Sequence, residues 1–164
     1  AGVAAPMLEL PGLDEIDHKE ILRRHRPDLL GHEALMRELA AAKDPQRAFQ
    51  TLFVAAVARW TGGEHAHEYR LSWPSFRERT LAALAALAGQ PQGEIWAFTS
   101  GGPIGVIVST LLNAPESASF ELSWPLANTS ISKLQRGRSG PRLLSYNAWP
   151  HLESAGDPAL VTLR

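Results

Sequence analysis

Hydrophobic and polar positions divide the chain into a helical first half and a mixed second half. Residues 7–10 form a short apolar run that is compatible with a strand and stops at the Pro-Gly pair that follows. Next, the pattern predicts a short helix that begins at a cap, either Asp14 or Asp17, and ends before Pro27. The opening of the chain is therefore expected to alternate brief elements with breaks.

Three longer helices are predicted from Ala- and Leu-rich stretches. Two of them cover residues 28–42 and 45–60, and they are separated where Asp44 can cap a helix and Pro45 can begin one. The third begins near Pro74, after a polar loop, and stops at Gly89. Its buried side is expected to carry Phe76, Leu81, Leu84, Ala85, Leu87 and Ala88.

The pattern changes in the second half, where short apolar runs alternate with turns. Residues 94–99 have the length and composition of a buried strand, and a glycine turn and a helix from about Pro103 follow them. Alternating apolar residues over 120–124 predict a further strand, and Ile131 and Leu134 follow it. The turn RGRSG separates that stretch from PRLLSYNAW (residues 141–149), which is its expected hairpin partner. The order of elements predicts an α/β fold, with residues 1–164 forming one domain.

Composition excludes some classes of binding partner but says little about the fold. The chain has 45% apolar residues, 20% charged residues and a net charge of −1, so it has no strong electrostatic field to attract nucleic acid or anionic lipid. We therefore expect neither nucleic acid nor a membrane as a partner. Cysteine is absent, which suits a cytoplasmic protein and excludes thiolate chemistry.

The turn after residue 99 is the first candidate for chemistry. A helix that starts there directs unpaired backbone N–H groups and the positive end of its dipole over the strand end, and Gly101 and Gly102 leave room for an anion. Phosphate is the anion most often held in this way. The alternative is that the two glycines only connect a strand to a helix.

Two other chemistries are weaker matches to the residues. A serine-hydrolase site at Ser100 would require glycine at position 98, where Phe98 stands, and the possible partners His151 and Asp157 follow in the wrong order. A zinc site in EHAHE (residues 64–68) would need a distant third ligand, and no residue with obvious spacing supplies one. A solvated loop is the favoured interpretation of EHAHE, and we expect no metal and no cofactor.

The chain contains four motifs in a defined order: SFRERTLAALAAL, AFTSGGPIGVIVSTLLNAP, LANTSISKL and RLLSYNAWPHL. Their order and spacing resemble the histidine phosphatase superfamily, the phosphoglycerate mutase-like proteins. In that family a helix leads to a strand ending in Ser-His-Gly-Gly, then to a helix, a strand pair and a terminal LL..N...HL pattern. The resemblance implies a three-layer α/β fold with a largely parallel sheet flanked by helices. It also implies metal-free hydrolysis of a small phosphate ester through a phosphohistidine.

The resemblance assigns candidate site residues one by one. Glu15, within LPGLDEIDHKEIL, occupies the position of the family's acid/base carboxylate, and Ser100 stands where the family has its second catalytic histidine. Ser100 and the amides of Gly101 and Gly102 would hold phosphate oxygens. Asn128 corresponds to the family's asparagine at the mouth of the site. The expected ligand is thus a small phosphorylated molecule or inorganic phosphate.

Two departures from the family lower the expected activity. No Arg-His-Gly occurs in the chain, and RRHRP (residues 23–27) follows Glu15 in a helical setting, so the nucleophile is not carried onto His25. We therefore expect the chain to lack the family's first strand, which leaves strand edges open and makes a homodimer compatible with the sequence. A serine at position 100 donates one hydrogen bond but brings no charge. We expect this chain alone to be inactive; the alternative is a non-catalytic member that binds an anion or a protein.

The acidic segment can be aligned with the family's acid/base position in more than one register, so neighbouring carboxylates can take the place of Glu15. Asp14 and Asp17 lie within two residues of it, and a solvated helix start is the plain alternative for all three carboxylates. His151 matches a family position that is structural. Whether the three carboxylates reach the turn at Ser100 depends on the fold.

Overall fold

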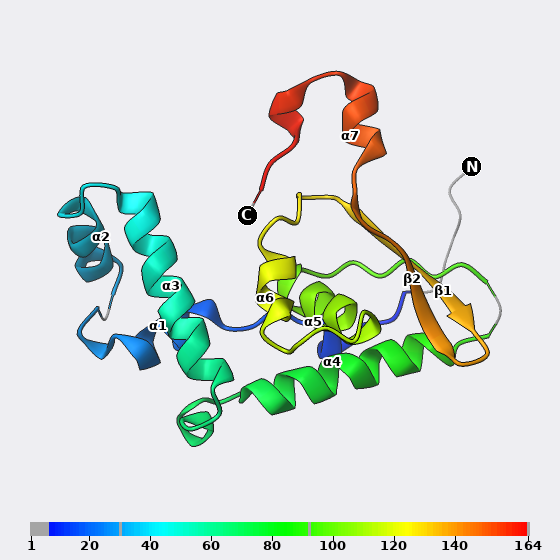
Figure 1. The fold of residues 1–164 in the computed structure, drawn as a ribbon, viewed down its shortest axis with the longest axis horizontal. Helices are drawn as coiled ribbons and strands as arrows, with labels where there is room; N and C mark the ends of the chain where they lie inside the picture. Colours follow the sequence, from blue (N-terminus) through cyan, green and yellow to red (C-terminus); the bar gives the residue numbers. More distant parts are fainter. Residues whose placement is uncertain (1–6, 30, 92, 164) are drawn as a thin grey trace. The chain divides into compact units, whose positions relative to one another are not determined.

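The computed structural model describes residues 7–29, 31–91 and 93–163, and it divides the chain into two compact units. One unit is Ile16–Phe76; the other combines Ala1–Glu15 with Arg77–Arg164. Figure 1 shows their elements, which are α1 (His18–His25), α2 (His32–Ala40), α3 (Pro45–Thr61), α4 (Trp73–Ala88), α5 (Gly101–Leu111), α6 (Ala118–Ser123), β1 (Ile131–Gly137), β2 (Gly140–Ala148) and α7 (Pro150–Ala155). None of the helices within the described residues is long and apolar enough to cross a membrane.

The helices of the Ile16–Phe76 unit begin where local capping chemistry predicts. The Asp17 side chain accepts a hydrogen bond from the Glu20 amide at 2.9 Å, so Asp17, and not Asp14, caps α1. Asp44 caps α3 in the same way, and Pro45 is the first residue of that helix. The helix predicted over 28–42 is shorter, because Gly31 has a φ of 100° and α2 begins after it.

Aromatic side chains form the core of this unit. Trp60 is 1% exposed and packs edge-on against Trp73, with ring centroids 5.3 Å apart. Its indole N–H donates to the Leu71 carbonyl at 2.9 Å, which satisfies the polar atom of an otherwise apolar side chain. Burial of these rings holds the end of α3 against the segment that enters α4.

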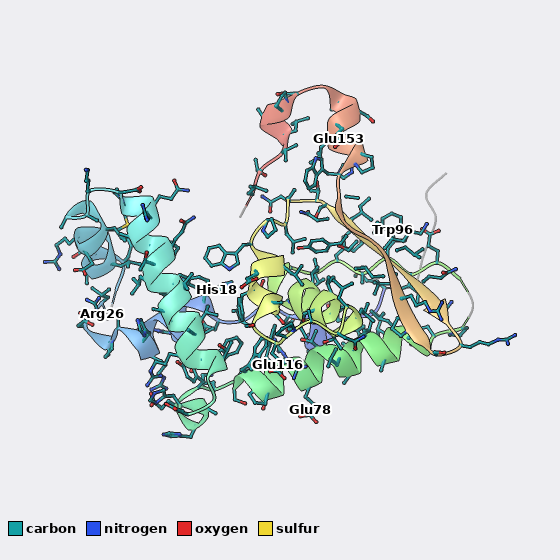
Figure 2. All side chains as sticks on the ribbon, in the orientation of Figure 1. His18, Arg26, Glu78, Trp96, Glu116 and Glu153 are labelled. Atoms are coloured by element: carbon teal, nitrogen blue, oxygen red, sulfur yellow. The ribbon has the colours of Figure 1, made fainter. Side chains whose placement is uncertain are left out.

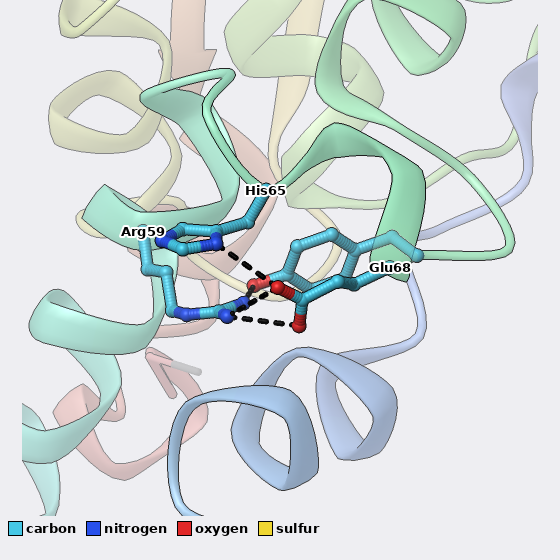
Figure 3. Close-up of polar contacts among 4 residues, drawn as sticks. Arg59, His65 and Glu68 are labelled. Carbon is cyan, nitrogen blue, oxygen red and sulfur yellow. Dashed lines mark hydrogen bonds and ion pairs between the residues drawn. The ribbon is translucent and has the colours of Figure 1, made fainter.

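Hydrogen bonds among charged side chains hold the EHAHE loop (residues 64–68) against α3 (Figure 3). Arg59 donates from one nitrogen to both carboxylate oxygens of Glu68 at 2.8 Å and from the other to the Tyr69 hydroxyl at 2.9 Å. His65 Nδ1 lies 2.9 Å from the same carboxylate. The bond from Arg59 lowers the pKa of Glu68, and the bond to Glu68 raises the pKa of Arg59. The expectation of a merely solvated loop was wrong, because α3 places Arg59 beside it.

In the other unit, α4 and α5 enclose a small apolar core. The buried members of that core are Leu13, Ala83, Leu84 and Ile107. The chain passes close to α4 at Gly12, where a Cβ would lie 2.6 Å from the Arg79 carbonyl oxygen. Glycine at this position is therefore required by packing. The predicted helix from Pro74 is confirmed as α4.

Residues 118–123 form helix α6, so the strand predicted over 120–124 was wrong. The reason lies in the helix before it: a Cβ on Gly105 would lie 2.1 Å from the Ser119 carbonyl oxygen, so the two backbones are in close contact. The hydroxyls of Ser109 and Ser119 also lie 2.8 Å apart in the buried interface. This packing selects a short helix where a brief apolar alternation favoured a strand.

The sheet is smaller than the family resemblance implied. β1 and β2 pair antiparallel around Gly140, which has a φ of 107°, so the predicted hairpin is confirmed. Among the described residues this pair is the whole sheet, and neither residues 7–10 nor residues 94–99 form a strand. The structure is thus a mixture of helices with a two-stranded sheet, and no three-layer parallel sheet is formed by these residues. A strand requires a neighbour to hydrogen-bond with, and the described part of the chain places none beside residues 94–99.

Candidate functional site

Helix α5 begins at the predicted turn, two residues earlier than expected. Ser100 is its N-cap in an extended conformation, and the Ser100 side chain makes no capping hydrogen bond. The first turn comprises Gly101, Gly102 and Pro103, and proline has no N–H. The two glycine amides are therefore the donors that this helix end directs outward.

The carboxylate of Glu15 lies at this helix end. The Gly102 amide donates a hydrogen bond to Glu15 Oε2 at 3.1 Å, across 87 positions of sequence, in a partly buried setting. The contact joins the carboxylate and an amide that the sequence analysis selected independently. A negative group at the N-terminus of a helix is stabilised by the positive end of the helix dipole.

Two further hydrogen bonds hold the backbone that carries Glu15. Thr99 Oγ1 donates to the Leu13 carbonyl at 2.6 Å, and Arg79 Nη2 donates to the Asp14 carbonyl at 2.7 Å. Both carbonyls precede Glu15 directly, so α4 and the residue before Ser100 set the position of the carboxylate. The sequence analysis missed Thr99 and Arg79, because α4 carries two arginines in its first half, Arg77 and Arg79, and no local pattern distinguishes them.

Asn128 is not brought to this turn by any described contact. Its side-chain Nδ2 donates to Thr162 Oγ1 at 2.8 Å, and its backbone N–H donates to the Thr162 carbonyl at 2.9 Å. Asn128 therefore anchors the C-terminal segment to the loop after α6. Ser123 at the end of α6 and Leu126 in that loop lie beside the turn, since their atoms would be 3.5 Å and 3.8 Å from a Cβ on Gly101.

A second asparagine, which sequence reasoning did not select, orders the loop that carries Leu126. Asn147 Oδ1 accepts from the Ala127 amide at 3.0 Å, and its Nδ2 donates to the Pro125 carbonyl at 2.8 Å. Asn147 has a φ of 52°, a conformation that asparagine tolerates better than most residues. This bridge from β2 holds the loop that places Leu126 beside the start of α5.

The serine-hydrolase alternative finds no support in the contacts of the described residues. His151 Nε2 lies 3.1 Å from Thr129 Oγ1, and Asp157 accepts from the Ala159 amide at 2.9 Å, where it caps a short turn. Both side chains are thus engaged in local structure. No group of three or more potential metal ligands occurs within the described ranges either.

The arrangement at α5 suits an oxygen acceptor that carries negative charge. It offers the Gly101 and Gly102 amides, the helix dipole and the Ser100 hydroxyl, and the Glu15 carboxylate already uses one of those donors. A sequence model of the histidine phosphatase superfamily (branch 1) matches residues 2–148. No curated protein and no solved structure matches the chain significantly.

Proposed function

The chain belongs to the histidine phosphatase superfamily, and from this premise we propose that the turn at Ser100, Gly101 and Gly102 is its phosphate site. The ligand is inorganic phosphate or a small phosphorylated molecule. The amides of the two glycines and the Ser100 hydroxyl hold its oxygens, and no metal is required. Asn128 is left out of this site because its side chain is engaged with Thr162.

One contact carries the proposal: the hydrogen bond from the Gly102 amide to the Glu15 carboxylate. An amide that donates to a carboxylate oxygen at a helix N-terminus is equally suited to a phosphate oxygen, because both are anionic acceptors. A phosphate on this turn would therefore lie within hydrogen-bonding reach of Glu15. That position matches the role of a proton donor to the leaving oxygen, which the family resemblance gives Glu15.

Catalysis would require a nucleophile that these residues do not contain. The sequence has no Arg-His-Gly, and at position 100 serine replaces the family's charged histidine. We expect phosphate binding without appreciable turnover by this chain, because removal of a charged donor aimed at the transition state costs orders of magnitude in rate. Hydrolysis through a phosphohistidine belongs to a member that supplies the nucleophile. The largely parallel sheet is part of the same proposal, with residues 94–99 as one of its strands.

A non-catalytic role on the same scaffold is the second candidate. The neutral Ser100 favours it, since a binding protein needs the donors of the turn but not the positive charge of an imidazolium. Both candidates use the same anion site, and they differ only in whether a phosphoryl group is transferred.

Titration with inorganic phosphate, followed by amide chemical shifts, tests the site. We expect the Gly101 and Gly102 amides to shift. The Arg47 amide, which donates to the Asp44 side chain that caps its own helix, should stay unchanged because no glycine pair opens the start of α3 to an anion. Absence of any shift at α5 would refute the phosphate site. Hydrolysis of an aryl phosphate that is lost in Ser100→Ala would refute the expectation of inactivity and make Ser100 catalytic.

A further inference from the structure

Two hydrogen bonds join the segment that ends at Glu15 to the start of α5. Thr99 Oγ1 donates to the Leu13 carbonyl at 2.6 Å, and the Gly102 amide donates to Glu15 Oε2 at 3.1 Å. The donors are three residues apart in one segment, and the acceptors are two residues apart in the other. The two bonds therefore close a small ring that contains both the candidate proton donor and the glycine turn.

Thr99 is suited to hold this ring in one geometry. Its hydroxyl is the donor, because a carbonyl can only accept, and the bond lies in a partly buried setting. A β-branched side chain has few rotamers, so the hydroxyl loses little conformational freedom when the bond forms. Leu13, the accepting residue, is itself anchored, since its side chain is 9% exposed and belongs to the apolar core beside α4. The bond therefore ties Thr99 to a part of the chain that packing already holds in place.

Helix α4 supports the same segment from its inner side. Gly12 approaches the helix so closely that a Cβ would lie 2.6 Å from the Arg79 carbonyl oxygen, and Arg79 Nη2 donates to the Asp14 carbonyl at 2.7 Å. Figure 2 shows the neighbouring Glu78, an exposed residue, on the outer side of α4. Residues 12, 13 and 14 are thus each held by a different contact, and Glu15 is the next residue of the chain.

We propose that Thr99 is a positioning residue that couples the Glu15 carboxylate to the amides of the glycine turn. The bond between Thr99 and Leu13 closes the long loop between them, so the bond at Gly102 forms between groups that are already close. Without the hydroxyl, the backbone before Glu15 loses its tie to the residue that precedes Ser100. The carboxylate then lies on the Gly102 amide in a smaller fraction of the molecules. The assignment rests on the proposed role of Glu15 as a proton donor at the phosphate site.

The chemical shift of the Gly102 amide proton in the full chain measures this coupling without phosphate. Glu15→Gln removes the charge from the accepting group, so it should shift this amide when Thr99 is intact. In the Thr99→Val background, Glu15→Gln should shift it by at most about half as much, because fewer carboxylates lie on the amide. Thr99→Ser keeps a hydroxyl and should restore most of the response. Since no ligand is added, a failed phosphate titration and a failed coupling are separate results.

Thr110→Val is the matched control for the loss of a hydroxyl. Thr110 lies near the C-terminal end of α5, and its buried hydroxyl oxygen has no hydrogen-bond partner among the described residues. This variant should leave the response of Gly102 to Glu15→Gln unaltered. Thr99→Ala should reduce the response as Thr99→Val does, so the test does not depend on one variant. An undiminished response in the Thr99 variants, or an equal reduction in Thr99→Ser or Thr110→Val, would overturn the assignment.

Discussion

Glu15→Gln separates the two roles that the carboxylate at the start of α5 can have towards phosphate. Glutamine keeps the shape of the side chain and an oxygen acceptor for the Gly102 amide, but it removes the negative charge. If phosphate binds at this turn, the carboxylate competes with it for the same donor and repels it. The variant is therefore expected to bind inorganic phosphate more tightly than the unaltered chain.

The size of the effect follows from the geometry. Glu15 Oε2 lies 3.1 Å from the Gly102 nitrogen, so a phosphate oxygen on the neighbouring amides would lie about 4–6 Å from the carboxylate. Two like charges at about 5 Å repel by roughly 3 kcal/mol at an effective dielectric constant of about 20. Solvent and salt reduce this at a partly exposed site to about 1–2 kcal/mol, or roughly five- to thirty-fold in affinity.

Isothermal titration calorimetry with phosphate at pH 7 and low salt measures the change. Glu153→Gln is the control, because it removes the same charge from an exposed side chain on α7 and should leave the affinity unaltered. Although Glu15→Gln should bind phosphate more tightly, thermal unfolding should show that it is less stable than the unaltered chain. We expect the free energy of unfolding to fall by about 0.5–1 kcal/mol, because a negative charge is lost at the helix N-terminus. Affinity equal to or weaker than that of the unaltered chain would refute competition by Glu15.

Three further predictions address the turn, the packing of α5 and the response to acid. Ser100→His should tighten phosphate binding at pH 5.5 relative to pH 8, as calorimetry would show, because the imidazole gains a positive charge below its ordinary pKa. Gly105→Ala should lower the free energy of unfolding, measured by denaturant titration, by about 3 kcal/mol or more, because its Cβ would meet a backbone oxygen at 2.1 Å. Gly101→Ala is the control: its Cβ would lie 3.5 Å from the nearest atoms, so the free energy of unfolding should change by less than about 1 kcal/mol. Burial, followed by the charge of Arg59, lowers the pKa of His25 in the folded state. The unfolded chain therefore binds the proton more readily, so stability falls as pH drops below about 6.5; His25→Gln should flatten that part of a melting-temperature profile, and an unchanged slope would contradict the assignment.

Local sequence determined most helix boundaries and the hairpin. Each helix start depends on residues close by in sequence: Asp17 and Asp44 accept hydrogen bonds from amides three residues later, and Pro45 begins α3. Gly140 supplies the turn between β1 and β2. Such elements can be predicted from the sequence because their hydrogen bonds join residues only a few positions apart. The glycine turn after Ser100 could be predicted for the same reason.

Distant packing decided what the sequence analysis misjudged or missed. Residues 118–123 became a helix because Gly105 lets the two backbones meet. Residues 94–99 form no strand because a strand depends on its neighbour, and the described part of the chain pairs no segment with them. The asparagine that orders the loop near the turn is Asn147, which reaches it only through the hairpin.

The contact between Glu15 and Gly102 is the clearest case of a feature that only the tertiary structure decided. The family resemblance selected Glu15 and the glycine turn selected Gly102, but neither signal specifies which group lies at the start of α5. The carboxylate reaches that amide because Thr99 and Arg79 hold the two preceding carbonyls. Residues 87 positions apart meet only when the elements between them pack, and the free energy of that packing is not a property of either residue's neighbours in sequence.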